Sequence, residues 1–290
     1  MQFPLISVVT VVYNDIAHIV ETMDSVVGQD YPQIEYIIID GASSDGTREK
    51  IMEHIASNAN VDSKNNADSK KCEEQKDRIY LEATHREKNL RFKFLSETDS
   101  GIYDAMNKGI DLATGQWCNF MNCGDRFYDF NVLSNVAPLL DTRYGIVDGG
   151  IEIVYDENHK KIKYYDIVFG PFKIEFCHHQ ASFIQTYLLK QYHYDTNFKI
   201  LADTHLFAQL YQKEIIWKKI PNIIAMFNTQ GISQQLSLNH FKESIRVISL
   251  QGNFFCIIHT LYYILYIIPR VCIRKLLPKQ MANFIRQRLK

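Results

Sequence analysis

The stretch LISVVTVVYN, residues 5–14, opens with a largely apolar run, interrupted only by Ser7 and Thr10, and closes on a tyrosine and an asparagine. Two further apolar runs, residues 34–39 and 117–121, also stop abruptly at small polar or acidic residues. Apolar runs that alternate with helical patterns are typical of parallel strands buried on both faces of an α/β sheet. Ligands of such sheets bind beyond the carboxyl ends of the strands. Asp40 and Asp125, which follow the second and third runs, are therefore candidates for one shared site.

The chain of 290 residues is long enough for one large domain or two small ones, and its hydrophobic content of 46% is ample for a packed core. Its formal net charge of −1 gives no reason to expect a nucleic-acid partner. The charge is unevenly distributed, because no acidic residue follows Glu243. This asymmetry favours an anionic membrane surface or another acidic partner. The basic residues beyond that point are Arg246, Arg270, Arg274, Lys275, Lys279, Arg286, Arg288 and Lys290.

The cysteines contain no C-x-x-C pair, and the amino terminus leads into a predicted strand without the features of a signal peptide. Both observations favour a reducing compartment, so we expect a cytoplasmic protein. The six cysteines are Cys72, Cys118, Cys123, Cys177, Cys256 and Cys272.

Helical spacing of apolar residues predicts helices between the strands. The first follows Asp15, a candidate N-cap, and ends before Pro32. A second helix begins after the turn at residues 41–47, and a third covers residues 101–113. The stretch from 57 to about 90 is largely polar, and we interpret it as a surface insertion.

The second half of the chain has a different pattern. Residues 151–155 and 162–168 are predicted to form an antiparallel hairpin, residues 203–212 a helix, and residues 215–227 a pair of strands. No internal repeat is present, so this half is predicted to complement the first half at a binding site.

Residues 254–268 are apolar apart from a histidine, a threonine and tyrosine hydroxyls. A bilayer span takes about 20 apolar residues, so this segment is short, and its tyrosines suit an interfacial depth. We favour an interfacial membrane anchor over a buried or oligomer-forming helix and over a true span. The expected location is therefore peripheral, on the inner face of the cell membrane.

The chain contains the ordered motifs ISVVTVVYN, YIIIDGASSDGT, SETDSGIYDAMNKGIDLATGQWCNFMNCGD, CHHQASF, FKILADTHLF and QGIS. Together these motifs resemble those of the family 2 glycosyltransferases of the GT-A fold. The resemblance covers residues 5 to about 235 and implies a mostly parallel central sheet flanked by helices in residues 1–235, with a helical extension in residues 236–290. It also implies transfer of a sugar from a nucleotide diphosphate donor, most simply a UDP-sugar, to a glycan or lipid-linked acceptor, usually with inversion.

Asp125 matches the last acidic position of the family's metal-binding motif, which implies a Mn2+ or Mg2+ site. A diphosphate leaving group accumulates negative charge that a cation must neutralise, and a carboxylate must hold the cation. Here Asn122 and Gly124 stand where the family often has further carboxylates, so phosphates and water must complete the metal's coordination. The alternative is that Asp125 only caps a turn.

Nucleotide binding is implied for residues near the ends of the first strands. By resemblance, the backbone of Val12, Tyr13 and Asn14 lines the base, Asp40 contacts the base or ribose, and Asp99 helps to hold the nucleoside or donor. A carboxylate there can accept from a ring N–H or a ribose hydroxyl. Asp40 could instead only form a turn. Of two weaker candidates, a helix-capping role is favoured for Asp45 and a solvated helix position for Lys108.

Asp203 matches the family's catalytic base, which takes the proton of the acceptor hydroxyl. Its position at the start of a predicted helix would stabilise the ionised carboxylate, and an ordinary N-cap is the alternative reading. His179 and Gln180 match a pair that lies by the acceptor and the donor sugar, whereas His178 is better explained as a buried structural residue.

Two other classes of protein remain open. A sugar nucleotidyltransferase would need a glycine-rich basic loop after its first strand, which residues 13–16 do not provide. A non-catalytic nucleotide-sugar-binding protein would fit the reduced acidic motif, but the presence of both Asp125 and Asp203 favours an enzyme. The chain has no Gln-x-x-Arg-Trp motif, which disfavours a processive polysaccharide synthase.

Overall fold

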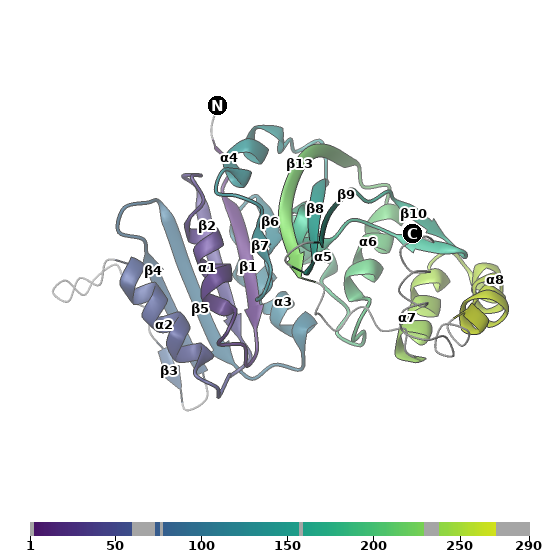
Figure 1. Cartoon of the computed structure of the whole chain (residues 1–290), viewed down its shortest axis with the longest axis horizontal. Helices are drawn as coiled ribbons and strands as arrows, with labels where there is room; N and C mark the ends of the chain where they lie inside the picture. Colours follow the sequence, from purple (N-terminus) through teal and green to yellow (C-terminus); the bar gives the residue numbers. More distant parts are fainter. Residues whose placement is uncertain (1–2, 60–72, 76–77, 157–158, 229–237, 271–290) are drawn as a thin grey trace.

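A computed structural model describes residues 3–59, 73–75, 78–156, 159–228 and 238–270. Its centre is an 11-stranded sheet with the strand order β3-β4-β5-β2-β1-β6-β12-β8-β13-β7, and β9 pairs with β8 (Figure 1). Helices cover both faces, so the predicted α/β class is confirmed. The strands of the sheet are β1 (Ile6–Val12), β2 (Ile34–Asp40), β3 (Glu73–Gln75), β4 (Arg78–Thr84), β5 (Leu90–Glu97), β6 (Trp117–Phe120), β7 (Arg126–Phe127), β8 (Ile146–Asp156), β9 (His159–Lys163), β12 (Ser182–Gln185) and β13 (Trp217–Asn228).

The parallel block β5-β2-β1-β6 confirms the three apolar runs as buried strands. All seven residues of β1 are buried, as are all seven of β2. The register pairs Val12 with Asp40, and Asp40 with Ser96 of β5. The carboxyl ends of three neighbouring strands therefore lie level at one edge of the sheet.

Two apolar cores lie on opposite faces of this sheet. Alternate residues of β1 divide between them, with Ile6 and Val8 in one core and Val9 and Val11 in the other. The first core is covered by α1, α2 and α4, and the second by α3, α5, α6 and α7. These helices are α1 (Ile19–Val27), α2 (Thr47–Asn58), α3 (Ile102–Leu112), α4 (Val132–Val136), α5 (Thr186–Tyr192), α6 (Ala202–Gln212) and α7 (Leu238–Ser249).

The part of the chain after α6 adds a helical pair at the end of the molecule opposite β4 (Figure 1). Helix α7 packs against α6 and against α8 (Asn253–Tyr262), which continues into a π-helical turn, Tyr263–Ile267. The small hairpin of β10 (Val168–Gly170) and β11 (Lys173–Glu175) lies beside α8. In the described part of the chain, no helix is both long enough and apolar enough to cross a bilayer.

Two expectations for local structure were wrong, and the structure adds a strand within the predicted insertion. Helix α1 begins at Ile19 with His18 as its N-cap, so Asp15 does not cap it; the Asp15 carboxylate instead contacts the His18 ring at 2.7 Å. Within the predicted insertion, β4 pairs with β5, because Ile79, Leu81 and Ala83 alternate toward the first core. The predicted strand pair near 215–227 is the single strand β13, which passes Pro221 through an irregularity in its pairing with β8.

The edge of the sheet opposite the carboxyl ends is fastened by one buried carboxylate. Glu35 of β2 is fully buried and accepts hydrogen bonds from the Ser7 hydroxyl at 2.6 Å and from the Thr114 N–H at 2.7 Å. Lys93 of β5 places its ammonium 2.7 Å from the same carboxylate. Burial alone would raise the pKa of Glu35, but Lys93, Ser7 and Thr114 hold it below its ordinary value.

We predict that Glu35→Gln lowers the free energy of unfolding by about 3 kcal/mol, because it leaves the partly buried Lys93 ammonium without its counter-charge. Urea denaturation at neutral pH measures the change. Since the Glu35 pKa is lowered in the folded state, this contribution is present above the ordinary glutamate pKa and is lost as the pH falls through the lowered value. The exposed Glu49→Gln, on α2, is the control and should change stability by less than about 0.5 kcal/mol. Equal losses in the two variants would contradict the prediction.

Candidate active site

The carboxyl edge of β1 is the place where the chain reverses its direction across the sheet. The strands β2 and β5 follow on one side of β1, and β6 lies on the other side. In an open α/β sheet this switch point forms the crevice in which ligands bind. The residues that follow β1, β2 and β6 all belong to this edge.

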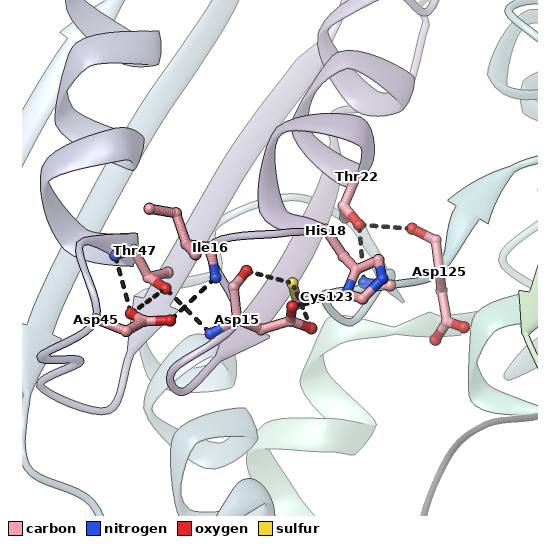
Figure 2. A network of polar contacts seen from close by, with 9 residues as sticks. Asp15, Ile16, His18, Thr22, Asp45, Thr47, Cys123 and Asp125 are labelled. Atoms are coloured by element: carbon pink, nitrogen blue, oxygen red, sulfur yellow. Dashed lines mark hydrogen bonds and ion pairs between the residues drawn. The ribbon is translucent and has the colours of Figure 1, made fainter.

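Side-chain hydrogen bonds fasten the loop after β1 to the loop after β2. Asn14 has a left-handed backbone, with φ 49°, and its side-chain oxygen accepts the Ser44 N–H at 2.8 Å. The N–H of Ile16 donates to the Asp45 carboxylate, which also accepts the N–H of Thr47 at the start of α2 (Figure 2). Asp45 therefore joins the two loops just before α2, but the N-cap of this helix is Gly46 and not Asp45.

Three residues predicted to bind the nucleotide, Val12, Tyr13 and Asp99, come together around Gly41. Gly41 donates its N–H to the Val12 carbonyl oxygen at 3.0 Å, and a Cβ placed on it would lie 2.6 Å from the Asp99 carboxylate and 3.2 Å from the Tyr13 ring. Tyr13 is 65% exposed, so its ring is available to a ligand. Burial raises the pKa of Asp99, partly offset by the Gly101 N–H.

Asp40 differs from its neighbours because it is fully buried. Its carboxylate accepts the hydroxyl of Ser96 at 2.6 Å and the N–H of Ser43 at 3.1 Å. In this arrangement Asp40 orders the loop that follows β2. A direct contact with a base or ribose stays a prediction.

Asp125 lies at the end of the loop after β6 and is only 8% exposed. Thr22 of α1 fixes this loop, since its hydroxyl donates to the Asp125 carbonyl oxygen and accepts the Gly124 N–H. The Asp125 carboxylate points away from Thr22 (Figure 2) and accepts the Gln180 side-chain N–H at 2.9 Å. Burial raises the pKa of Asp125 to about 6, even though Gln180 and His179 favour its ionised form.

His179, the residue before Gln180, lies close to a second carboxylate, that of Asp203. His179 and Gln180 belong to a 3-10 turn, η2 (His179–Ala181), that precedes β12. His179 Nδ1 lies 3.6 Å from the Asp203 carboxylate, and His179 Nε2 lies 3.1 Å from the Asn122 side-chain nitrogen. With the Asn122 amide donating to Nε2, the neutral imidazole carries its proton on Nδ1, facing Asp203.

Asp203 lies in the first turn of α6 and is not its N-cap, which is Leu201. Its side chain is 26% exposed and accepts the Thr204 N–H at 2.7 Å. Burial would raise the pKa of Asp203, but His179 and the Thr204 N–H hold it below the ordinary value. The carboxylate is therefore ionised at neutral pH.

Buried polar atoms without a hydrogen bond gather around this turn. They include Asn119 Oδ1, Asn122 Oδ1, His179 Nδ1, Gln180 Oε1 and Asp148 Oδ1. Such atoms are rare in folded proteins and are costly unless a ligand satisfies them. Asn119 and Asp148 were not candidates in the sequence, and because β8 also carries Glu152 and Asp156, the charge of Asp148 alone would not have identified it. Burial raises the pKa of Asp148 to about 6.

Two weaker candidates have structural roles. The ring of His178 packs against Tyr165 at 4.5 Å, and burial lowers the His178 pKa to about 4. The ammonium of Lys108 lies 2.9 Å from the Glu97 carboxylate and donates to the Thr98 carbonyl oxygen. The QGIS motif falls outside the described residues.

The described residues contain no group of three or more histidine, cysteine, aspartate or glutamate side chains arranged to hold a metal ion. Near Gln180 the described residues offer one carboxylate, Asp125, and the free amide oxygen of Asn122. Magnesium and manganese accept such oxygen ligands and commonly take phosphate oxygens and water for the rest.

A family model for "Glycosyl transferase family 2" matches residues 7–70 and 73–219. The chain belongs to this family. Among relatives of this family 2 glycosyltransferase, a PGL/p-HBAD biosynthesis glycosyltransferase of Mycobacterium bovis (strain BCG / Pasteur 1173P2) is 26% identical over 239 residues, which is 80% of this chain and 79% of that protein. A glycosyltransferase assigned to teichuronic acid biosynthesis, TuaG of Bacillus subtilis (strain 168), is 29% identical over 124 residues, 43% of this chain and 37% of that protein.

Solved structures support the fold of this glycosyltransferase. S. aureus TarS 1–349 in complex with UDP-GlcNAc superposes with a TM-score of 0.59 at 16% identity, over 85% of this chain and 66% of that chain. The mannosyltransferase PcManGT from Pyrobaculum calidifontis, in complex with GDP-Man and Mn2+, gives a TM-score of 0.60 at 16% identity, over 91% of this chain and 70% of that chain. The expectation of a GT-A type glycosyltransferase fold is confirmed.

Proposed function

We propose that this glycosyltransferase moves a sugar from a nucleotide diphosphate donor, a UDP-sugar in the first instance, to an acceptor hydroxyl with inversion at the anomeric carbon. The observation that carries the proposal is the turn at His179 and Gln180, whose side chains reach Asp203 and Asp125 respectively. A single displacement needs a base for the acceptor and a group that holds the diphosphate. The UDP-GlcNAc and GDP-Man bound by the structural neighbours support this class of donor.

The donor's nucleoside is assigned to the loops around Gly41. Tyr13 offers an exposed ring on which a base can stack, and Asp99 offers a carboxylate beside it. Val12, Asn14 and Asp40 hold the backbone of these loops through hydrogen bonds, of which that of Asp40 is buried. In this assignment Asp40 acts through Ser43 and Ser96, whereas Tyr13 and Asp99 contact the ligand.

The diphosphate is assigned to the loop after β6. Asp125 and the free amide oxygen of Asn122 would hold Mn2+ or Mg2+ together with phosphate oxygens. When bound, such a cation neutralises the charge that develops on the leaving diphosphate. The Mn2+ in the PcManGT complex supports a divalent metal in this site.

Asp203 is assigned as the base. Its carboxylate takes the proton of the acceptor hydroxyl as that oxygen attacks the anomeric carbon on the face opposite the nucleotide diphosphate. The low pKa of Asp203 keeps it ionised, and His179 at 3.6 Å favours one orientation of the carboxylate. The free polar atoms around η2 are available to sugar hydroxyls.

The acceptor is proposed to be a glycan or a lipid-linked glycan at the inner face of the cell membrane. Relatives named for PGL/p-HBAD and teichuronic acid biosynthesis support an acceptor of this kind. The ring of Phe172, beside β10, lies 5.5 Å from the ring of Tyr262 in α8, and we group Phe172 with the exposed apolar residues of α8 and the turn that follows it as the apolar patch. Arg270 adjoins it, and six further basic residues follow in the sequence with no acidic one. The apolar patch consists of Phe172, Phe254, Ile257, Leu261, Ile264, Leu265 and Ile268, each at least 49% exposed.

Removing the metal, or the charge of Asp125, should weaken nucleotide binding. We expect the affinity for UDP or GDP, measured by titration calorimetry, to fall at least about tenfold when excess chelator replaces Mn2+, because phosphate charge then has no counter-ion. Asp125→Asn keeps an acceptor for Gln180 and should bind the nucleotides weakly with or without Mn2+. The exposed Asp129→Asn serves as the control. Donor hydrolysis that continued undiminished in chelator would refute the metal assignment.

Asp203→Asn should separate binding from chemistry. The amide cannot take a proton, so the rate of nucleotide release from the best donor of a UDP-, GDP- and dTDP-sugar panel should fall about 100-fold. Donor affinity should stay within about twofold, since the nucleotide loops lie elsewhere. Asp111→Asn at the end of α3 is the control and should retain full turnover. Near-normal hydrolysis by Asp203→Asn would show that another group is the base.

Membrane attachment should depend on the apolar patch. The double variant Ile257→Asp and Leu265→Asp should no longer float with vesicles that contain phosphatidylglycerol. Inserting the new carboxylates into the membrane interface is unfavourable. Their negative charge also offsets the attraction between the basic residues and the anionic lipid, which is about 1 kcal/mol per basic residue. Ile216→Asp, which changes an exposed isoleucine outside the patch, is the control and should still float. Unchanged nucleotide binding checks that the double variant is folded. If the wild-type protein failed to float with these vesicles, the membrane proposal would be wrong.

A further inference from the structure

Glu243 of α7 is a buried carboxylate with an unusual set of partners. It is only 6% exposed and accepts three backbone N–H groups in succession. One oxygen accepts the Lys199 N–H at 2.8 Å, and the other accepts the Ile200 and Leu201 N–H groups at 3.0 and 2.9 Å. These residues form the segment that leads directly into α6 and Asp203.

The same segment is held from its other sides. The hydroxyl of Tyr103 on α3 donates to the Ile200 carbonyl oxygen at 2.7 Å. The Arg246 guanidinium, one turn after Glu243, lies 4.2 Å from the ring centre of Phe198. Glu243 is nevertheless the group that satisfies the consecutive N–H donors at the amino end of α6, where an anion is also favoured by the helix dipole.

Helix α7 is itself fixed by its neighbour α8. His259 of α8 is buried between the Ser244 hydroxyl, 2.9 Å away, and the Pro171 carbonyl oxygen, 2.6 Å away. Because Ser244 follows Glu243 in the sequence, this contact fastens α7 at the position from which Glu243 reaches α6.

We propose that Glu243 is a positioning residue for the transfer reaction: it holds the backbone of residues 199–201 so that Asp203 meets His179 and the acceptor. This inference rests on the proposed role of Asp203 as the base. Hydrogen bonds to an ionised acceptor are roughly twice as strong as neutral ones, and three of them together define the direction in which α6 begins. A displacement of about 1 Å at a catalytic group can cost about 100-fold in rate.

Glu243→Gln is the central test. The variant keeps one acceptor oxygen but replaces the other with an amide NH2 group, which cannot accept a hydrogen bond from a backbone N–H. We expect kcat for donor hydrolysis, with the best nucleotide sugar of the panel and water as acceptor, to fall between about 10- and 100-fold. The KM for the donor and the affinity for the free nucleotide should stay within about twofold, because Glu243 does not contact the nucleotide loops.

A matched control separates positioning from general stability. Val247→Ala removes a fully buried side chain from the same helix one turn later, so it should lower Tm at least as much as Glu243→Gln. Its kcat, measured well below both melting temperatures, should stay within about threefold of the wild-type value. Glu243→Asp keeps the charge and both oxygens on a shorter side chain and should recover part of the lost kcat; it replaces the central test if Glu243→Gln does not fold.

A double-mutant cycle asks whether Glu243 acts through Asp203. In the Asp203→Asn background, Glu243→Gln should lower the residual kcat by less than about threefold, because the group it positions has already been disabled. Normal kcat in Glu243→Gln, an equal loss in Val247→Ala, or the full loss repeated in the double variant would overturn the inference. If Asp203→Asn lowers kcat while Glu243→Gln does not, only the Glu243 inference fails. If Asp203→Asn is normal, the base assignment fails and this inference fails with it.

Discussion

The structure depends on one short turn that joins two carboxylates supplied by distant parts of the chain. His179 contacts Asp203 and its neighbour Gln180 contacts Asp125, so consecutive residues reach α6 and the loop after β6. The turn itself is held by Asn119, whose side chain donates to the carbonyl oxygens of Gln180 and Ser182. Because β12 pairs with both β6 and β8, the turn lies where the amino-terminal parallel block meets the remainder of the sheet.

The two edges of the parallel block have opposite polar character. At one edge, both oxygens of the Glu35 carboxylate have partners, which are donor groups of Ser7, Thr114 and Lys93. At the other edge, Asn119, Asn122 and Gln180 each leave a buried oxygen free. Buried polar atoms without hydrogen bonds lower the stability of the folded protein, so favourable interactions elsewhere must offset this loss of free energy. The Glu35 network is suited to that compensation, since it joins β1, β2 and β5 without contributing to the candidate site.

The sequence allowed the strands and their ends to be predicted because the signals are local. The runs of β1, β2 and β6 are mostly apolar and fully buried, and the acidic residues at or after the ends of β2 and β6 lie at the expected edge. The same reasoning could not foresee that His179 would reach Asp203 or that Asn122 would reach His179, since contacts across such separations depend on how sheet and helices pack. The strand β4 was missed because its short alternation of apolar and polar residues follows a long polar stretch. Glu243 was interpreted only as the last acidic residue before a basic tail, since its contacts with residues 199–201 depend on the packing of α7.

Gly41 has a consequence for any attempt to redesign the donor preference of this protein. Even a methyl group at this position would collide with the Asp99 carboxylate, 2.6 Å away, and press on the Tyr13 ring. A side chain at this position therefore requires the Asp99 carboxylate and the Tyr13 ring to shift, and both belong to the proposed donor site. A library that aims at a new nucleotide would be better directed at exposed rim positions such as Tyr13 and Ser44, leaving the glycine untouched.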